Sequence, residues 1–133
     1  MEKVKLVSNI ELEFDLSSLS PDVLGRYGYA REIAPEILEI HSGIKQVVLF
    51  GSVAEFKAGP TSDIDVAVIH RLSIPYNSQE HQALLNNYRG FKGGLVDTPF
   101  RVHLIILPEE DIRKADYSVS KNIAEKGIIL CSR

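Results

Sequence analysis

Residues 46–69 read QVVLFGSVAEFKAGPTSDIDVAVI, in which two apolar runs flank a short polar loop and a pair of aspartates. The first run, at 47–50, is β-branched and aromatic and stops at a Gly-Ser pair, which predicts a buried strand that ends in a turn. Glycine lets a ligand approach the backbone closely, and about one helical turn can follow. We therefore expect the amides at Gly51 and Ser52 to bind an anion, for which phosphate is the obvious candidate.

The second apolar run begins at the two aspartates, after a Gly-Pro-Thr-Ser turn signal. In a strand that starts here, Asp63 and Asp65 leave one face together, about 6.6 Å apart at the backbone. Carboxylates at this spacing can share one cation or hold two neighbouring ones, and hard oxygen ligands favour Mg²⁺ or Mn²⁺ over zinc. An isolated D-x-D pair is more often a solvated strand face, but a phosphate loop beside it predicts phosphoryl chemistry.

The strand running into Gly-Ser, the ten intervening residues and the D-x-D pair together resemble the nucleotidyltransferase superfamily of the DNA polymerase β type, especially its minimal members. The matching stretches are LFGS at 49–52 and SDIDV at 62–66, and NIAEKGIIL at 122–130 is similar to the way such small domains end. The resemblance implies that Gly51 and Ser52 contact a nucleoside triphosphate and that Asp63 and Asp65 bind the divalent cations. We add Ser62, which opens the second matching stretch, as a further nucleotide contact.

The sequence departs from the family pattern in two places. Relatives often carry an arginine just after the Gly-Ser pair, whereas the first cation here is Lys57. A third carboxylate is expected from a later strand, and the best match, RVHLIIL at 101–107, has His103 at its middle polar position. We expect His103 to face the aspartates as a third catalytic group; Asp97, six residues upstream, could replace it only through a shifted register or a bent loop.

Length and composition indicate one domain covering residues 1–133, with a strand and helix extension at about 1–44. The apolar content of 44% and charged content of 25% are those of an average globular protein. A formal charge of −3 gives no electrostatic support for nucleic acid binding. We find neither a signal-peptide core nor a membrane-spanning apolar run, so we expect a cytoplasmic protein. Cys131 is the only cysteine, which excludes an internal disulfide.

Further patterns predict the remaining elements. Residues 8–16 alternate between polar and apolar, which indicates a half-buried strand that could form the edge of a sheet. Ser20 and Pro21 are typical of a helix start, and Pro35 predicts a break or restart of that helix. The rest of the pattern is a short helix from Asn77, a connecting loop at 90–99, a strand at 100–107, helices starting at 108 and after 118, and a strand at 128–130. The loop could form a lid carrying Arg89 and Lys92, although a surface connection is the commoner role.

Strands and helices in this order predict an α/β fold. We expect a mixed sheet built from the strands that begin near residues 46, 63 and 100, with helices packed mainly on one face. The resemblance implies the nucleotidyltransferase fold for this arrangement, with the aspartates at an edge of the opposite face.

Three functions fit these residues. The first is a metal-dependent transfer of a nucleoside monophosphate, AMP from ATP, to an unidentified acceptor hydroxyl. The second is an impaired nucleotidyltransferase-like module that lacks the third acid and binds nucleotide or a partner protein without turnover. The third is a two-metal phosphohydrolase. The resemblance also implies a possible helical partner, as in two-component toxin–antitoxin pairs, or a homodimer.

Overall fold

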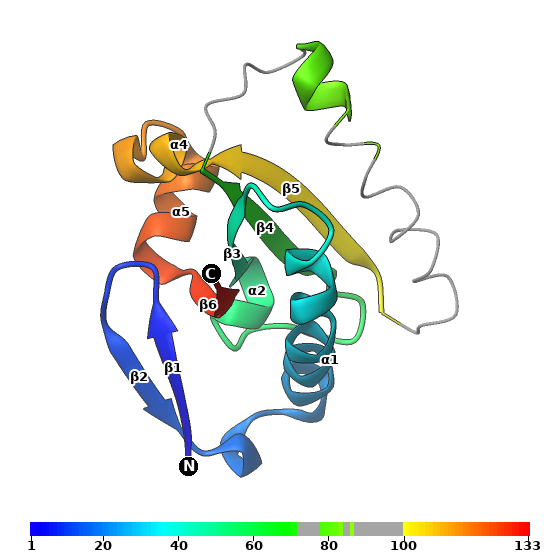
Figure 1. The fold of residues 1–133 in the computed structure, drawn as a ribbon. Coiled ribbons are helices and arrows are strands. Elements are labelled where there is room, and N and C mark those ends of the chain that lie inside the picture. Colours follow the sequence, from blue (N-terminus) through cyan, green and yellow to red (C-terminus); the bar gives the residue numbers. More distant parts are fainter. Residues whose placement is uncertain (72–77, 84–85, 87–99) are drawn as a thin grey trace.

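The computed structural model describes residues 1–71, 78–83, 86 and 100–133 of the chain. The chain begins with two strands, a 3-10 turn and a long helix (Figure 1). These are β1 (Glu2–Leu6), β2 (Glu11–Phe14), η1 (Leu16–Ser18) and α1 (Pro21–Leu38). The remaining elements are β3 (Ile44–Phe50), α2 (Gly51–Ala54), β4 (Ile64–His70), β5 (Val102–Pro108), α4 (Glu109–Lys114), α5 (Ser118–Lys126) and β6 (Ile128–Ser132).

The described strands form one six-stranded sheet in the order β2-β1-β6-β3-β4-β5. Only β4 and β5 pair in parallel, and the other neighbours are antiparallel. The sheet is therefore mixed, and the predicted α/β fold class is confirmed. Because the two strands at the centre of the predicted site, β3 and β4, are interior strands, their backbones are held on both sides.

One face of the sheet packs against α1. Ser20 caps this helix by accepting a hydrogen bond from the Val23 amide at 3.2 Å, as the sequence predicts. The predicted break at Pro35 is wrong, because α1 continues through it to Leu38. The proline removes one helical hydrogen bond, but fully buried Ile37 and the other core residues of the last turn stabilise the helix by tertiary packing.

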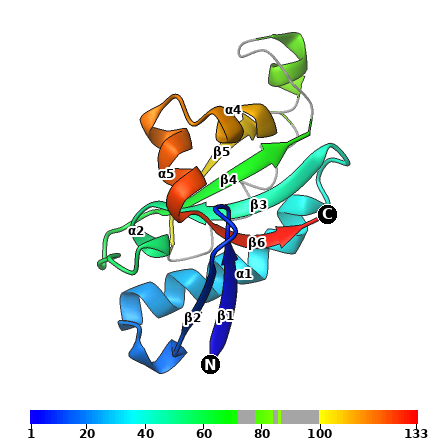
Figure 2. The same cartoon turned by 90° about the vertical axis from the view of Figure 1, so that its left-hand side faces the viewer.

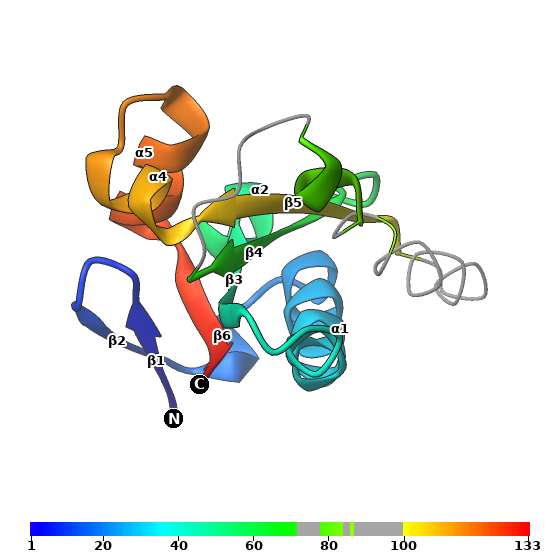
Figure 3. The same ribbon diagram turned by 45° about the horizontal axis from the view of Figure 1, so that its top comes forward.

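The other face packs against α4 and α5, so helices cover both faces rather than mainly one (Figure 3). Ile112 of α4 and Ile123 of α5 join a core cluster with alternate residues of β3 and β4. Those strand residues are Val48, Phe50, Ala67 and Ile69. The strands are apolar on both sides, which requires cover on both sides and explains the difference from the prediction. By alternation along β4, Asp65 lies on the face that carries α4 and α5.

The N-terminal residues form a hairpin in place of the single strand predicted at 8–16. The chain turns at Asn9, whose φ of 73° is left-handed, and this turn shortens the predicted strand to β2. The unpredicted β1 pairs with both β2 and β6. Figure 2 shows the hairpin at the same end of the molecule as α1, to which it is tied by the Arg31–Glu2 ion pair at 2.6 Å.

Two predictions from the sequence fall partly or wholly outside the described residues. The helix predicted from Asn77 is represented only by helical residues at 79–83 and 86. The loop at 90–99 lies entirely outside them. None of the described helices combines the length and apolarity needed to cross a membrane.

Candidate functional site

The turn after β3 has the conformation that the Gly-Ser pair predicts. Gly51 adopts a φ of +76°, and α2 begins at this residue as a single turn of four residues. Ser52 lies in that turn, where its carbonyl accepts a hydrogen bond from the Lys57 amide at 2.8 Å. Fully buried Val53 anchors the turn in the core. A left-handed glycine is needed here because an L side chain rarely adopts this φ.

Asp65 lies between this turn and β5. An ideal Cβ on Gly51 would stand 2.4 Å from the Asp65 Oδ2 atom, so the carboxylate closely approaches the glycine. In the parallel pairing of β4 with β5, Asp65 is opposite His103, whose Nδ1 lies 3.4 Å from Asp65 Oδ1. The structure therefore brings together the glycine, the second aspartate and the histidine that the sequence places in one site.

The two aspartates differ in environment. The Asp63 side chain is 43% exposed and lies 3.9 Å from the Arg101 guanidinium, whereas the Asp65 side chain is 28% exposed. Burial raises the pKa of the Asp65 carboxyl above its ordinary value; contact with His103 partly offsets the rise, and the nearby charge of Asp63 adds to it. A carboxylate in this position gains from a cation that neutralises it.

The loop that leads into the aspartates is fixed from α1 by a buried arginine. Arg26 is only 6% exposed, and its guanidinium donates hydrogen bonds to the carbonyl oxygens of Ser62 at 2.9 Å and Pro60 at 2.8 Å. It also donates to the Asp22 carbonyl at 3.1 Å and lies 5.0 Å from the centre of the Phe100 ring, just before β5. One side chain thus connects the helix, the aspartate loop and the segment that leads to His103.

Sequence reasoning missed Arg26, although its position carried a signal. Three residues after Val23 and four before Ala30, it falls on the buried stripe of α1, where a charged residue needs partners. Ser62, predicted as a nucleotide contact, uses its Oγ to accept a hydrogen bond from the Gly59 amide at 2.9 Å. That bond closes the turn, and the nucleotide contact stays a prediction.

The donor groups at this site are two carboxylates and an imidazole. Among the residues that the structure describes, no group of three or more His, Cys, Asp or Glu side chains is arranged to hold a metal ion. Asp63 nevertheless lies close enough that its charge adds, as the smallest contribution, to the raised pKa of Asp65, whose main cause is burial. The two aspartates therefore fit a cation whose other ligands are water and substrate phosphates, which is the usual coordination of Mg²⁺. The imidazole beside them suits Mn²⁺ better than Mg²⁺.

Cationic side chains follow the Gly-Ser turn. Glu55, at the end of α2, forms ion pairs with Lys126 at 3.1 Å and Lys57 at 4.0 Å. The hydrogen bond from Lys126 is the main reason that the pKa of Glu55 is lowered. Lys57 remains 75% exposed and is the first cation after the turn. The other predicted contributors, Asp97, Arg89 and Lys92, lie outside the described residues.

Comparison with known proteins identifies the family and the fold. Residues 30–130 match the nucleotidyltransferase domain family. A crystal structure from Sulfolobus solfataricus, of a protein provisionally described as a nucleotidyltransferase, superposes with a TM-score of 0.53. The alignment covers 87% of this chain and 92% of that chain at 18% identity, so it shows the shared fold alone. No curated protein matches the sequence significantly. The match over residues 30–130 spans Gly51, both aspartates and His103, and the chain belongs to the nucleotidyltransferase domain family.

Proposed function

We propose that this protein transfers AMP from ATP to a hydroxyl group of an acceptor, with Mn²⁺ or Mg²⁺ as the cofactor. The family and the fold support nucleotidyl transfer in general. The observation that carries the more specific proposal is the placement of Asp65 between a left-handed glycine and His103. In the proposal, Gly51 contributes backbone contacts to phosphate, Asp65 binds the cation and His103 accepts a proton.

In the proposed reaction, the acceptor oxygen attacks the α-phosphorus of ATP and forms a new P–O bond. The bond from the α-phosphorus to its bridging oxygen breaks, and pyrophosphate leaves with the electron pair. A bound cation supplies charge neutralisation between the carboxylates and the triphosphate. Gly51 and Ser52 hold the phosphates through the backbone, so that catalysis comes mostly from positioning and electrostatics.

The histidine has a defined part in this scheme. In the tautomer that carries its proton on Nδ1, the imidazole would donate toward Asp65 Oδ1, 3.4 Å away, and leave Nε2 to take the proton from the acceptor hydroxyl. Asp65 orients the imidazole through Oδ1, while Oδ2 lies on the side of Gly51. The two oxygens of one carboxylate therefore serve two tasks in the proposal, and the His103 side chain, 58% exposed, stands open to an incoming acceptor.

A second function is favoured by one observation, the imidazole at the position where relatives carry an acid. A site with only two carboxylates holds metal more weakly, and the domain would then bind nucleotide or a partner protein without turnover. The two proposals share their residues and differ in chemistry. Formation of a nucleotidylated acceptor and pyrophosphate distinguishes the first proposal from the second.

The experiment that tests the proposed function is incubation of the protein with α-labelled ATP, Mn²⁺ or Mg²⁺, and cell lysate as a source of acceptors. Label carried onto a macromolecule, with pyrophosphate released, supports the transfer. Label retained in ATP while the protein binds it supports the binding module. Release of free phosphate from γ-labelled ATP without transfer supports the phosphohydrolase and contradicts both. The Asp63→Asn/Asp65→Asn double variant is the matched control.

A further inference from the structure

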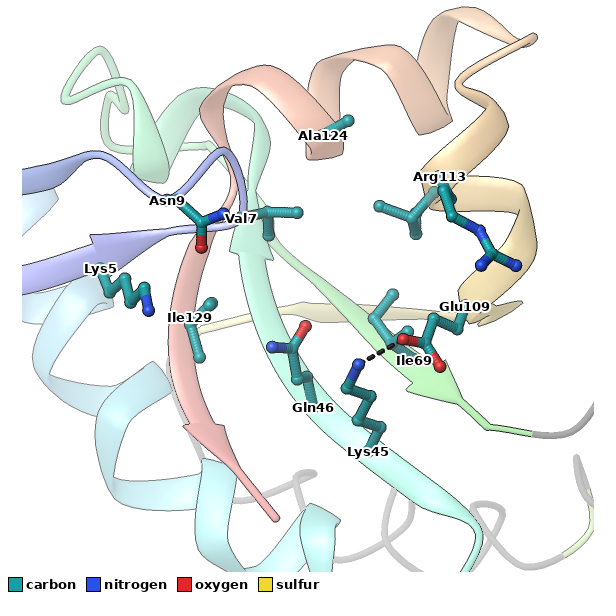
Figure 4. Close-up of a pocket in the computed structure, with 11 residues that line it drawn as sticks. Lys5, Val7, Asn9, Lys45, Gln46, Ile69, Glu109, Arg113, Ala124 and Ile129 are labelled. Carbon is teal, nitrogen blue, oxygen red and sulfur yellow. Dashed lines mark hydrogen bonds and ion pairs between the residues drawn. The ribbon is translucent and has the colours of Figure 1, made fainter.

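A cavity of about 360 Å³ opens between the β1–β2 turn, β3, β6 and helices α4 and α5 (Figure 4). It lies on the α4/α5 side of the sheet, the face that also carries Asp65, but none of the predicted site residues lines it. Its volume falls at the lower end of the range for small-molecule sites. We call it the hairpin cavity, after the β1–β2 turn that forms one wall.

The inner wall of the hairpin cavity is apolar. Ile69 of β4, Ile129 of β6 and Ile112 of α4 contribute aliphatic side chains, with Val7 from the β1–β2 turn and Ala124 from α5 beside them (Figure 4). Ile69 and Ile112 belong to the core cluster of this face, and Val7 and Ala124 pack against it. The wall is therefore part of the folded core and is preformed.

The rim of the cavity is positively charged. Lys5, Lys45 and Arg113 line it together with one acid, Glu109, which forms an ion pair with Lys45 (Figure 4). That pair neutralises one of the three cations. The hydrogen bond from Lys45 is the main reason that the pKa of Glu109 is lowered, so this acid stays negatively charged.

Lys5 and Arg113 carry the two remaining positive charges, although Arg113 also lies near Glu109 and helps to lower the pKa of that acid. Within residues 1–71, 78–83, 86 and 100–133, neither Lys5 nor Arg113 forms a salt bridge. Both are exposed and stand on opposite sides of the cavity mouth, on β1 and α4. Gln46 and Asn9 add amide groups between them, which can donate further hydrogen bonds.

We propose that the hairpin cavity binds a small organic anion that has an apolar body. The aliphatic wall takes the body, and the positive charges of Lys5 and Arg113, on either side of the mouth, attract a carboxylate or phosphate group there. Burial of the body removes apolar surface from water, and charge-assisted hydrogen bonds fix the head group. A neutral aliphatic molecule lacks the second contribution and an inorganic anion lacks the first.

The test is a calorimetric titration of the whole protein with four probes: octanoate, octyl phosphate, octanol and inorganic phosphate. Octanoate should bind with an affinity at least about tenfold above those of octanol and phosphate, a difference of roughly 1.4 kcal/mol. Octyl phosphate keeps the apolar body and replaces the carboxylate head, and its binding must persist in Asp63→Asn/Asp65→Asn, which separates this cavity from the aspartate site. Phosphate or octanol binding as tightly as octanoate would overturn the proposal, as would no binding by either octanoate or octyl phosphate.

Matched variants locate the binding. Lys5→Gln/Arg113→Gln removes the two cations and should weaken octanoate binding about tenfold or more. Lys3→Gln/Lys114→Gln makes the same charge change on the same two elements, outside the cavity, and should leave binding within about twofold. Ala124→Leu fills the wall and should abolish binding while the melting temperature is retained. Equal weakening in both double variants would show a general charge effect and contradict the proposed site.

Discussion

The Oδ2 atom of Asp65 occupies the space where a side chain on Gly51 would begin, 2.4 Å from an ideal Cβ. The conformation of the Asp65 side chain therefore depends on the absence of a side chain at Gly51. Gly51→Ala should push the carboxylate away and also impose a left-handed φ on alanine, at a cost of about 1–2 kcal/mol. We expect lower stability by that amount and loss of ATP binding, measured by denaturant unfolding and by calorimetry.

Gly28→Ala is the matched control for this variant. Gly28 lies inside α1, and an added Cβ would meet no atom within 4 Å. Because alanine favours a helix over glycine, this variant should gain about 0.5–1 kcal/mol and bind ATP normally. Normal ATP binding by Gly51→Ala would contradict the claim that the site depends on the close approach of Asp65 to Gly51.

Arg26 is predicted to be a positioning residue for the aspartates. Arg26→Met keeps the apolar length of the side chain but leaves the carbonyls of Ser62 and Pro60 without their donor, which should cost about 2–4 kcal/mol. Because the loop before Asp63 loses its attachment, metal-dependent ATP affinity should fall even at temperatures where the variant is fully folded. Calorimetry at low temperature measures this loss.

Arg31→Met supplies the comparison, since Arg31 is on the same helix but is exposed and pairs with Glu2. This change should cost less than about 1 kcal/mol and leave ATP affinity unchanged. If Arg26→Met binds ATP as tightly as Arg31→Met while folded, then Arg26 serves stability alone.

His70 should make the fold sensitive to mild acid. It is 1% exposed, its ring nitrogens have no hydrogen-bond partner among the described residues, and the rings of His41 and His70 lie 5.9 Å apart. Burial, with smaller contributions from His41 and His81, lowers the pKa of His70 from 6.5 to about 4. Between pH 6.5 and about pH 4, His70 is therefore protonated in the unfolded chain but neutral in the folded chain.

Neutral His70 therefore does not lower the free energy of unfolding above pH 6.5. As the pH falls toward 4, its protonation in the unfolded state lowers that free energy by about 3 kcal/mol in total. Urea unfolding at a series of pH values measures the slope. His70→Leu should reduce the slope between pH 6.5 and 4, because leucine takes no proton in either state. An unchanged slope in this variant would assign the acid sensitivity to other groups.

The metal preference should depend on residue 103. Because a histidine stands where relatives carry a third acid, the site has one carboxylate ligand fewer, and wild type should work better with Mn²⁺ than with Mg²⁺, which prefers hard oxygen ligands. His103→Asp should raise the ratio of Mg²⁺-supported to Mn²⁺-supported transfer by about tenfold. His103→Asn introduces a side chain of the same size as aspartate but without its charge, and it should not raise this ratio. An active wild type that is unaffected by His103→Ala would remove the histidine from the mechanism.

The local elements of the site were predictable because each rests on a short-range pattern. The apolar run that stops at Gly51, the alternation through Asp65 and the polar position of His103 are all visible in sequence. The sequence predicts that the strands beginning near residues 46, 63 and 100 share one sheet, and the structure gives their pairing and register. In this register Phe50 pairs with Asp65, and Asp65 pairs with His103. Sequence periodicity cannot predict such pairings between strands.

What the sequence could not show depends on tertiary contacts. Pro35 is tolerated in α1 because the residues around it are buried, and β1 forms because β6 and β2 offer it partners on both sides. A positioning role for Arg26 can be predicted only when its carbonyl partners, 34 and 36 residues away in sequence, are known. Each of these outcomes was decided by parts of the chain far away in sequence.

The central claim is that Asp63 and Asp65 hold a divalent cation that binds ATP. Calorimetric titration of Mn-ATP into wild type and into Asp63→Asn/Asp65→Asn tests it most directly. The double variant should fold with a melting temperature at or above that of wild type, because burial disfavours the charged form of Asp65, and should lose metal-dependent ATP binding. Equal affinity for Mn-ATP in the two proteins would contradict the assigned site.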